Sequence, residues 1–320
     1  MTEPLIIGVP SKGRLQENTV AFFARAGLQI KQPGGARNYR GRLAGVANVE
    51  IAFLSASEIA KEIAAGHVHM GVTGLDLVKE TIADWETKCH LVTKLGFGQA
   101  DVVVAVPDSW IDVESILDLA DVAVDFRNRH GRSMRVATKY LTLTRTFFAD
   151  QGIADYRIVE SLGATEGAPA AGTAELIVDI TTTGSTLRAN RLKIPQDGVI
   201  LESEAHLVAA RSASWSAEAL NAARVILDRV AADQDAQQRV ELRFDQGYDP
   251  VLIAELEDKY QVLDPFGAEA RPVTLLCPRE HRHHVIDALR TGGATYVMVN
   301  EIGDLFRAEQ PMFKALQEAL

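Results

Sequence analysis

The sequence has little cysteine, little positive charge and no long apolar run. Its two cysteines, Cys89 and Cys277, are far apart and in no metal-ligand spacing, which indicates packing roles in a reducing compartment. The net charge of −10 argues against a general binder of nucleic acid or of anionic membranes, because such a protein needs an extended basic surface. No apolar stretch approaches the roughly 20 residues that span a bilayer, and Met1–Pro4 lacks the basic region of a secretion signal. We therefore expect a cytoplasmic protein with no membrane and no nucleic-acid partner.

The composition that is present is typical of a folded protein. Hydrophobic residues make up 47% and charged residues 24%, which argues against disorder. At 320 residues the chain is longer than one typical domain, so two or three domains are expected. Strand patterns alternate with helix patterns, as in α/β proteins.

Residues 176–190 combine an apolar strand with a polar turn. The strand is apolar apart from Asp179, and this lack of polar alternation predicts a central strand of a parallel sheet that is covered on both faces. Gly184 permits a sharp turn, and a helix from Thr186 to Asn190 would point its unpaired N–H groups into that turn. The hydroxyls that can donate to a phosphate there belong to Thr182, Thr183, Ser185 and Thr186.

Asp179 extends this pattern from a phosphate to a sugar phosphate. At the carboxyl end of the strand it is placed to accept from a sugar hydroxyl, as acidic residues do at nucleotide sites in open α/β sheets. The stretch therefore predicts a cradle for ribose 5-phosphate. A plain strand-to-helix connection is the alternative on the local sequence alone.

Basic residues follow the first predicted strand, Leu5–Val9. Lys12 and Arg14 lie between this strand and the next helix pattern, and charges at the carboxyl end of a strand face the crevice in which open α/β sheets bind ligands. Both are candidate anion contacts, with a solvated loop as the alternative. A glycine-rich basic loop over 34–42, which contains Arg40, could reach over a phosphate or be a mobile surface loop.

Two other polar clusters are interpreted as solvated surface. The basic patch Arg127–Arg132 follows a short predicted strand, Val122–Val124, and such charge runs favour a solvated loop. His281, His283 and His284 lie on a predicted helix, where a solvated face is favoured over metal binding because no cysteine or carboxylate cluster accompanies them.

The tail predicts a unit of its own. Strand patterns over 240–244, 261–264, 273–277 and 296–299 and helix patterns over 250–260 and 280–290 give the order βαββαβ of a ferredoxin-like unit. The polar residues 231–238 before it are expected to form a linker.

The residues around the polar turn also match a known family. Their spacing resembles the signature of the ATP phosphoribosyltransferase family, which opens histidine biosynthesis. The matching positions are Glu166, Gly172, Ala174, Ile177, Asp179, Thr183, Gly184, Thr186 and Leu187. Pro10–Leu15 is similar to the family's amino-terminal segment, which lines the active site. The resemblance covers residues 5–211 by motif and the remainder by topology only.

A second family segment implies further site residues. Gly71–Val78 resembles a strand-to-helix switch of the family, which implies that Thr73, Gly74 and Asp76 face the same cleft. Asp76 could instead be a simple residue of a helix N-terminus.

A third segment matches in part. Arg135–Leu141 resembles the family pattern Arg-(Ile/Val)-Ala-Thr-x-Tyr-Pro, so Thr138 and Tyr140 are implied site residues although leucine replaces the proline. After Gly98 the family often has Arg-Cys, whereas this chain has Gln99 and Ala100, so we assign that turn no binding role.

The resemblance implies an α/β fold with a bilobal catalytic part, similar to type II periplasmic binding proteins, and a C-terminal ferredoxin-like, ACT-like domain. The implied limits are 1–104 with 191–235 for lobe I, 105–190 for lobe II with the phosphoribosyl pyrophosphate loop, and 236–320 for a regulatory ACT-like domain.

The resemblance also implies a reaction, in which the adenine N1 of ATP attacks the anomeric carbon of phosphoribosyl pyrophosphate and pyrophosphate leaves. The implied catalytic residues are Glu166, Asp179 and Lys12. The implied contacts of ATP or pyrophosphate are Arg14, Thr73, Gly74, Asp76, Thr138 and Tyr140. Mg²⁺ is the implied cofactor, held mainly by substrate phosphates. Histidine is the implied feedback inhibitor, and a homo-oligomer, a hexamer, the implied assembly.

Two alternatives stay open at this point. A bilobal small-molecule-binding or sensor protein would use the same fold without catalysis. A nucleobase-salvage phosphoribosyltransferase shares the Thr-Gly-x-Thr turn but typically has two adjacent acids before it, where this chain has Val178 and Asp179.

Overall fold

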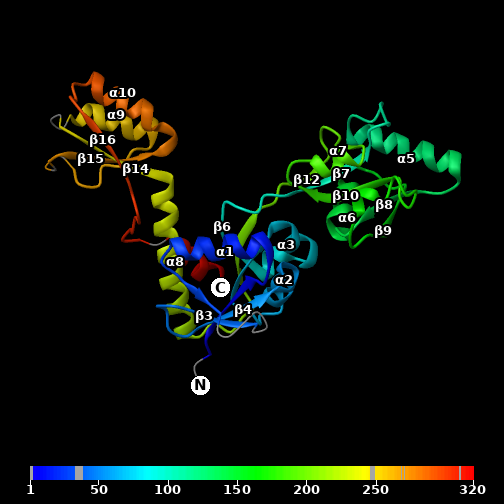
Figure 1. Cartoon of the computed structure of the whole chain (residues 1–320), viewed down its shortest axis with the longest axis horizontal. Helices are drawn as coiled ribbons and strands as arrows, with labels where there is room; N and C mark the ends of the chain where they lie inside the picture. Colours follow the sequence, from blue (N-terminus) through cyan, green and yellow to red (C-terminus); the bar gives the residue numbers. More distant parts are fainter. Residues whose placement is uncertain (1–2, 33–38, 246–248, 268, 270, 310) are drawn as a thin grey trace.

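A computed structural model describes residues 3–32, 39–245, 249–267, 269, 271–309 and 311–320 and arranges the chain in three units, each built on its own sheet. Figure 1 shows lobe I at the centre, lobe II to one side, and the C-terminal unit at the far end of the long helix α8 (Ala217–Gln238). The chain passes between the two lobes twice, once on the way out and once on the way back.

Lobe I has a sheet of seven strands with helices on both faces. In order across the sheet, the strands are β2 (Ile30–Lys31), β3 (Arg40–Leu43), β4 (Val49–Leu54), β1 (Leu5–Pro10), β5 (Met70–Gly74), β13 (Ala205–Ala210) and β6 (Cys89–Lys94). The strand β1 is parallel to β4 and β5, whereas β13 runs antiparallel to β5 and β6. The helices are α1 (Gly13–Arg25), α2 (Ala56–Ala64), α3 (Leu75–Thr81), α4 (Trp85–Lys88) and α8.

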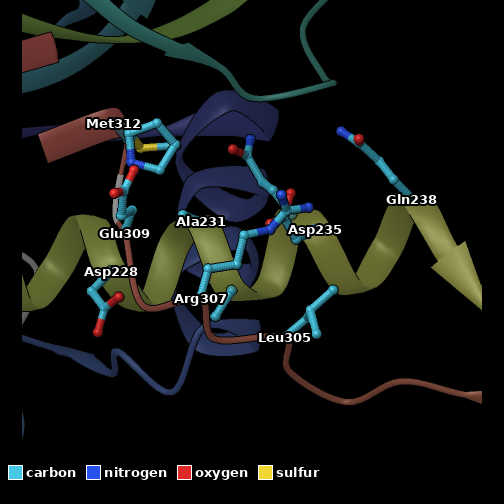
Figure 2. A pocket seen from close by; sticks show the side chains of 11 residues that line it. Asp228, Ala231, Asp235, Gln238, Leu305, Arg307, Glu309 and Met312 are labelled. Atoms are coloured by element: carbon cyan, nitrogen blue, oxygen red, sulfur yellow. The ribbon is translucent and has the colours of Figure 1, made fainter. Parts of the chain in front are cut away.

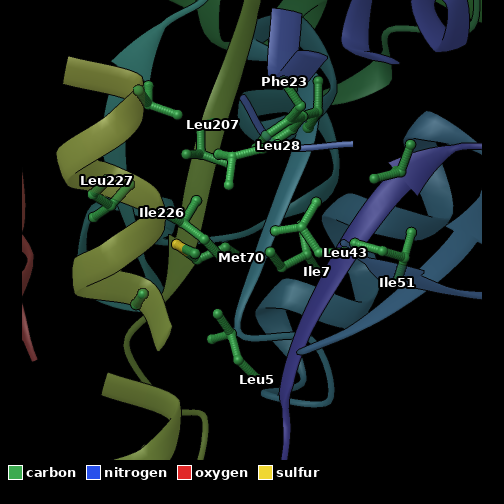
Figure 3. Packing of buried hydrophobic residues seen from close by; sticks show 14 of the residues in the cluster. Leu5, Ile7, Phe23, Leu28, Leu43, Ile51, Met70, Leu207, Ile226 and Leu227 are labelled. Carbon is green, nitrogen blue, oxygen red and sulfur yellow. The ribbon is translucent and has the colours of Figure 1, made fainter. Parts of the chain in front are cut away.

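The apolar faces of α1 and α8 cover one side of this sheet, and those of α2 and α3 cover the other. Figure 3 shows Ile226 of α8 packed near Met70 and Leu207 of the sheet. Because β1 lies between these layers, its residues are almost completely buried, as its unbroken apolar sequence predicts.

Lobe II repeats this arrangement around β10 (Leu176–Thr181). In order across its sheet, the strands are β11 (Leu192–Lys193), β7 (Asp101–Pro107), β10, β8 (Met134–Thr138) and β9 (Tyr156–Glu160), and β12 (Val199–Leu201) also pairs with β7. The helices are α5 (Ile116–His130), α6 (Leu141–Asp150), the short 3₁₀ helix η1 (Thr165–Gly167) and α7 (Ser185–Ala189). The helices α5 and α6 cover one face, and the side chain of Leu187 in α7 packs on the other.

The prediction for β10 is right in part. The strand lies in the middle of its sheet and its first three residues are buried. It is parallel to β8 but antiparallel to β7, because β7 carries the chain in from lobe I, so the sheet is mixed rather than purely parallel.

The two lobes share one strand order, β4-β1-β5-β13-β6 in lobe I and β9-β8-β10-β7-β11 in lobe II. In both, the antiparallel strand next to the third parallel strand is the one that arrives from the other lobe. This is the bilobal, type II periplasmic-binding-protein-like α/β fold that we expected.

The C-terminal unit is a sheet of three strands, β15 (Val273–Pro278), β14 (Arg239–Phe244) and β16 (Val297–Glu301), with helices α9 (Pro250–Tyr260) and α10 (Arg282–Thr291) and the 3₁₀ turn η2 (Arg279–His281). The strand expected over 261–264 is reduced to one bridge, between Leu263 and Leu276. This bridge lies on the outer side of β15, where the second strand of a ferredoxin-like unit belongs, so the predicted order βαββαβ is wrong only in the extent of that strand.

After β16 the chain returns to lobe I. The N–H of Leu305 donates to the carbonyl of Ala232 in α8, and the last helix, α11 (Pro311–Ala319), packs on α8 and β6 with Leu316 completely buried. Figure 2 shows the side chains that line a hollow between α8 and this returning segment. The hollow has a volume of about 130 Å³, and Arg307 in its wall forms an ion pair with Asp235 at 2.6 Å. The predicted limits 1–104, 105–190, 191–235 and 236–320 stay predictions, and the structure adds that residues inside the last range complete lobe I.

Two local predictions are wrong. Val122–Val124 lies inside α5 rather than in a strand, because Ser115 and Asp118 form a capping box and the buried stripe Ile116, Leu119 and Ala123 has helical spacing. The expected linker over 231–238 is the last part of α8, where Ala232 and Ala236 are buried.

Candidate active site

The turn after β10 lines a hollow of about 370 Å³ in lobe II. Its lining residues are Ala100, Glu166, Asp179, Ile180, Thr181, Thr182, Thr183, Ser185, Thr186 and Leu187. Gly184 has a φ of +67°, a left-handed backbone conformation that favours glycine. A Cβ at this position would lie 3.0 Å from a nitrogen at the flexible end of the Arg188 side chain. The helix after it begins at Ser185, one residue earlier than expected.

Hydrogen bonds within the turn fix its shape. The N–H of Gly184 donates to Oγ1 of Thr181 at 2.9 Å, and Nη2 of Arg188 donates to the carbonyl of Thr183 at 3.0 Å. The side chains of Thr182, Thr183, Ser185 and Thr186 are exposed, as a site for an incoming ligand requires. The predicted cradle residues therefore lie together in one preformed turn.

Two carboxylates share the hollow with these hydroxyls. Burial raises the pKa of the Asp179 carboxyl, and the charge of Glu166 acts in the same direction. The N–H of Ile180, which donates to Oδ1 of Asp179 at 2.8 Å, and the charge of Lys139 act in the opposite direction. Glu166, thirteen positions earlier in η1, thus lines the same hollow as Asp179.

A second hollow of about 460 Å³ lies between the lobes. From lobe I it is lined by Arg14 at the start of α1 and by Gly74 and Asp76 at the β5–α3 junction, together with neighbouring residues. From lobe II it is lined by Ile180 and Thr182, which also line the first hollow. The two hollows therefore form one continuous cleft that both lobes contribute to.

A buried hydrogen-bond network joins the lobes beside this cleft. The hydroxyl of Tyr140 donates to Oδ2 of Asp76 at 2.9 Å, and the hydroxyl of Ser203 donates to Oδ1 at 2.9 Å. Burial raises the pKa of the Tyr140 hydroxyl, and the nearby Asp76 charge raises it further. The alternative interpretation of Asp76, as a simple residue of a helix N-terminus, is therefore incomplete. Its carboxylate accepts one hydrogen bond from Tyr140 of lobe II and one from Ser203 on the chain that returns to lobe I.

Thr73 and Thr138 are fully buried, each at the end of a central strand. Oγ1 of Thr73 donates to the carbonyl of Ala56 at 2.8 Å, and Oγ1 of Thr138 accepts from the N–H of Tyr140 at 2.8 Å. Direct substrate contacts of these two threonines stay predictions. Their hydroxyls have structural partners, which shape the two strand-to-helix junctions.

Lys12 and Arg40 lie apart from the residues that line the two hollows. Lys12 is the exposed N-cap residue of α1, two positions from Arg14, and in the described part of the chain it lines neither hollow. Arg40 lies in β3 and forms an ion pair with Glu50 on β4. Residues 33–38 of the predicted glycine-rich loop lie outside the described residues.

Sequence reasoning missed several residues of the site. Gln99 and Ala100, to which we assigned no binding role, line the cleft, and the hydroxyl of Thr182 donates to the carbonyl of Gln99 at 3.2 Å. Lys139 was missed because it occupies the variable position of its family pattern, although a cation at the end of a central strand is itself a signal. Arg188, which braces the turn, and Glu80, described below, carried no signal in the sequence.

Most of the basic patch Arg127–Arg132 belongs to the end of α5 rather than to a loop, since the helix runs to His130, with Gly131 as its C-cap and Arg132 just beyond it. Arg127 pairs with Asp155, and Arg132 pairs with Glu175 at 2.9 Å. Despite the opposing effect of partial burial, hydrogen bonds from Arg135 and Arg132 lower the pKa of Glu175 to about 2. Arg127 and Arg132 therefore connect the end of α5 to the segments just before β9 and β10.

Two of the three tail histidines contact the ring of Tyr260. His284 stacks on Tyr260 with ring centres 5.9 Å apart, and His281 also contacts this ring. Across the described ranges, no three His, Cys, Asp or Glu side chains come together in a way that could hold a metal ion by themselves.

Among the residues that the structure describes, there is no helix with the length and apolar character that crossing a bilayer demands.

The fold and the cleft define the class of the protein: a bilobal α/β protein with a hydroxyl-rich turn and two carboxylates in the cleft between its lobes. The family model for ATP phosphoribosyltransferase (HisG) matches residues 55–232. An ATP phosphoribosyltransferase of Nitrobacter hamburgensis is 55% identical over 324 residues, covering 100% of this chain and 99% of the relative. One of Rhodopseudomonas palustris is 54% identical over 323 residues, with the same coverage.

A solved structure agrees in fold. The chain matches the ATP phosphoribosyl transferase (HisG:HisZ) complex of Thermotoga maritima with a TM-score of 0.55 and 23% identity, over 71% of this chain and 96% of that one. The chain belongs to the ATP phosphoribosyltransferase family, the glycosyltransferases of the first step of histidine biosynthesis. This confirms the resemblance and decides against both alternatives, a sensor without catalysis and a nucleobase-salvage transferase.

Proposed function

We propose that the two hollows hold the two substrates of the transfer, phosphoribosyl pyrophosphate in lobe II and ATP toward lobe I. The observation that carries this proposal is the shared wall of Ala100, Ile180 and Thr182, through which the two hollows meet. The exposed hydroxyls and the backbone of the turn at Gly184 suit the 5-phosphate. Asp179 suits the ribose hydroxyls, and Arg14 suits a phosphate of the partner substrate.

The reaction needs alignment more than a protein nucleophile. The adenine N1 forms a bond to the anomeric carbon while the bond from that carbon to pyrophosphate breaks and its electron pair leaves with the pyrophosphate. Positive charge builds on the ribose ring during this exchange, so nearby carboxylates stabilise the transition state. Asp179 and Glu166 are the carboxylates placed for this role. Holding both substrates in line supplies a further large part of the rate.

The donor set of the hollow fits Mg²⁺. Two carboxylates in one polar hollow offer the oxygen ligands that this ion prefers, and substrate phosphates would complete its coordination. In this proposal Asp179 and Glu166 would hold the magnesium ion when it is bound, and the ion would neutralise charge on the departing pyrophosphate.

Three further parts of the proposal concern the whole protein. We infer that the C-terminal unit binds histidine as feedback inhibitor, that the chain forms a homo-oligomer, a hexamer, and that it works in the cytoplasm. Support comes from the relatives, which share the full length of the chain and therefore also the C-terminal unit.

Selective changes on the two sides of the cleft test the substrate placement. The variant Ser185→Ala should raise KM for phosphoribosyl pyrophosphate several-fold with little change for ATP, because one charge-assisted hydrogen bond is lost. Arg14→Ala should do the reverse. Initial rates of phosphoribosyl-ATP formation, measured with each substrate varied in turn, give both constants. If both variants alter the same KM, the proposed placement is wrong.

A further inference from the structure

The N-terminus of helix α6 in lobe II is capped by a residue of lobe I. The carboxylate of Glu80 in α3 accepts from the N–H of Thr142 at 3.0 and 3.1 Å and from the N–H of Leu143 at 3.0 Å. The first N–H groups of a helix have no partner within the helix, and a negative charge there is favoured by the helix dipole. The N-cap residue, Tyr140, turns its own side chain to Asp76 instead.

Glu80 and Asp76 act on α6 from one face of α3. They are four residues apart, so their side chains lie on the same side of that helix. Asp76 accepts from the Tyr140 hydroxyl just before α6, and Glu80 accepts from the first turn. Together they hold the start of α6 against lobe I through one side-chain and three backbone hydrogen-bond contacts.

The segment that they hold is continuous with the site. The strand β8 ends at Thr138, which pairs directly with Val178, the residue before Asp179. Lys139 follows, and its charge lowers the pKa of Asp179. The position of the α6 start therefore fixes where Lys139 lies relative to Asp179, and fixes lobe II against the lobe I half of the cleft.

We propose that Glu80 is a positioning residue for the transfer reaction, which aligns the two halves of the cleft by capping α6 across the lobe boundary. This rests on the proposed function only in placing one substrate in each lobe. Most of the residues that line each hollow belong to one lobe, so the affinity for each substrate depends mainly on contacts within a lobe. The orientation of the lobes decides whether the adenine N1 and the anomeric carbon are in line. Loss of Glu80 should therefore lower kcat more than it changes either KM.

The variants Glu80→Ala and Glu80→Gln test this inference in the full-length protein. Alanine removes every acceptor, whereas glutamine keeps one side-chain oxygen that can accept from the helix N-terminus. We expect Glu80→Ala to lower kcat roughly 10- to 100-fold with KM values within about 2-fold, since a displacement of about 1 Å costs that much in rate. Glu80→Gln should recover part of the loss. Glu86→Ala, at an exposed carboxylate on α4, is the matched control and should behave as the unsubstituted protein.

Hydrogen exchange at the capped amides gives a second readout that does not depend on catalysis. In Glu80→Ala the amides of Thr142 and Leu143 should exchange faster, while those of β10 should not change. Unchanged exchange at Thr142 and Leu143 would show that the cap does not exist in solution. Faster exchange with an unchanged kcat, or equal losses with alanine and glutamine, would overturn the positioning role. Failure of the Ser185 and Arg14 tests would instead count against the substrate placement alone.

Discussion

The hydroxyl of Tyr140 in lobe II lies 2.9 Å from Oδ2 of Asp76 in lobe I, and both side chains are buried. The two residues are 64 positions apart and come from the ends of two different sheets. Burial raises the pKa of the Tyr140 hydroxyl and the Asp76 charge raises it further, which favours the neutral hydroxyl that donates this hydrogen bond. The contact therefore links the two lobes beside the cleft.

Replacing Tyr140 by phenylalanine removes this donor and keeps the ring. Oδ2 of Asp76 then lacks its donor, although Oδ1 keeps the Ser203 hydroxyl. We expect the free energy of unfolding to fall by about 1.5–3 kcal/mol, the usual cost of a hydrogen bond to a charged group. Urea denaturation measures it, with Tyr296→Phe, at a half-exposed tyrosine, as control. Equal stability of the two variants would show that the contact contributes nothing.

The second prediction concerns Asp179 and pH. Burial raises its folded-state pKa above the unfolded value, so its contribution to stability is present below the unfolded pKa and is lost as pH rises through the folded pKa. Asp179→Asn keeps an oxygen for the Ile180 N–H but carries no charge at any pH. The variant should therefore be more stable than the unsubstituted protein at about pH 7.5, with a smaller difference at about pH 5. Its kcat/KM for phosphoribosyl pyrophosphate should fall. Urea denaturation at both pH values checks the sign, and a variant that is less stable at the higher pH contradicts it.

The third prediction concerns α11. Leu316 is completely buried against lobe I, so Leu316→Ala should cost about 2–5 kcal/mol of unfolding free energy. Leu320→Ala, at an exposed position one turn further, should cost less than about 0.5 kcal/mol. Thermal unfolding of both variants measures the difference, and similar values would mean that α11 does not pack on lobe I in solution.

This packing also changes how feedback inhibition has to be tested. Cutting the chain after Asp233 removes α11 along with the C-terminal unit and uncovers the surface that Leu316 fills. Such a protein would lose stability for a reason unrelated to histidine. Substitutions inside the C-terminal unit, with α11 kept, separate the two effects.

Local sequence was sufficient to predict those elements whose structure is determined by their own residues. The apolar run of β10 and the required glycine at 184 predicted both the central strand and the turn. The helix α5 was missed because the valines at 122 and 124 have a strong strand preference, while the helix is set by a capping box and a buried stripe that begins six residues earlier. Where local preference and packing disagree, packing decides.

The contacts between the lobes could not be predicted in this way. Nothing in the residues near Glu80 indicates that its partners are the amides of Thr142 and Leu143. Every residue except proline has a backbone N–H, so the sequence does not show which of them a distant side chain will contact. The same holds for Gln99, which contributes its carbonyl to Thr182. Sequence identified the residues of the polar turn that line the first hollow. It missed the contacts that involve backbone, and it also missed Lys139, whose side-chain charge acts on Asp179.

Lobe I is assembled from both ends of the chain, since α11 and α8 join strands contributed by residues 5–94 and 205–210. Lobe II and the C-terminal unit each have their strands in one continuous segment of the chain, residues 101–201 and 239–301. During synthesis each of these segments can therefore fold as a unit once it has emerged from the ribosome. One face of the lobe I sheet stays partly uncovered until α11 has left the exit tunnel and can pack on it. The core that β1 begins is therefore closed only once α11 packs against it.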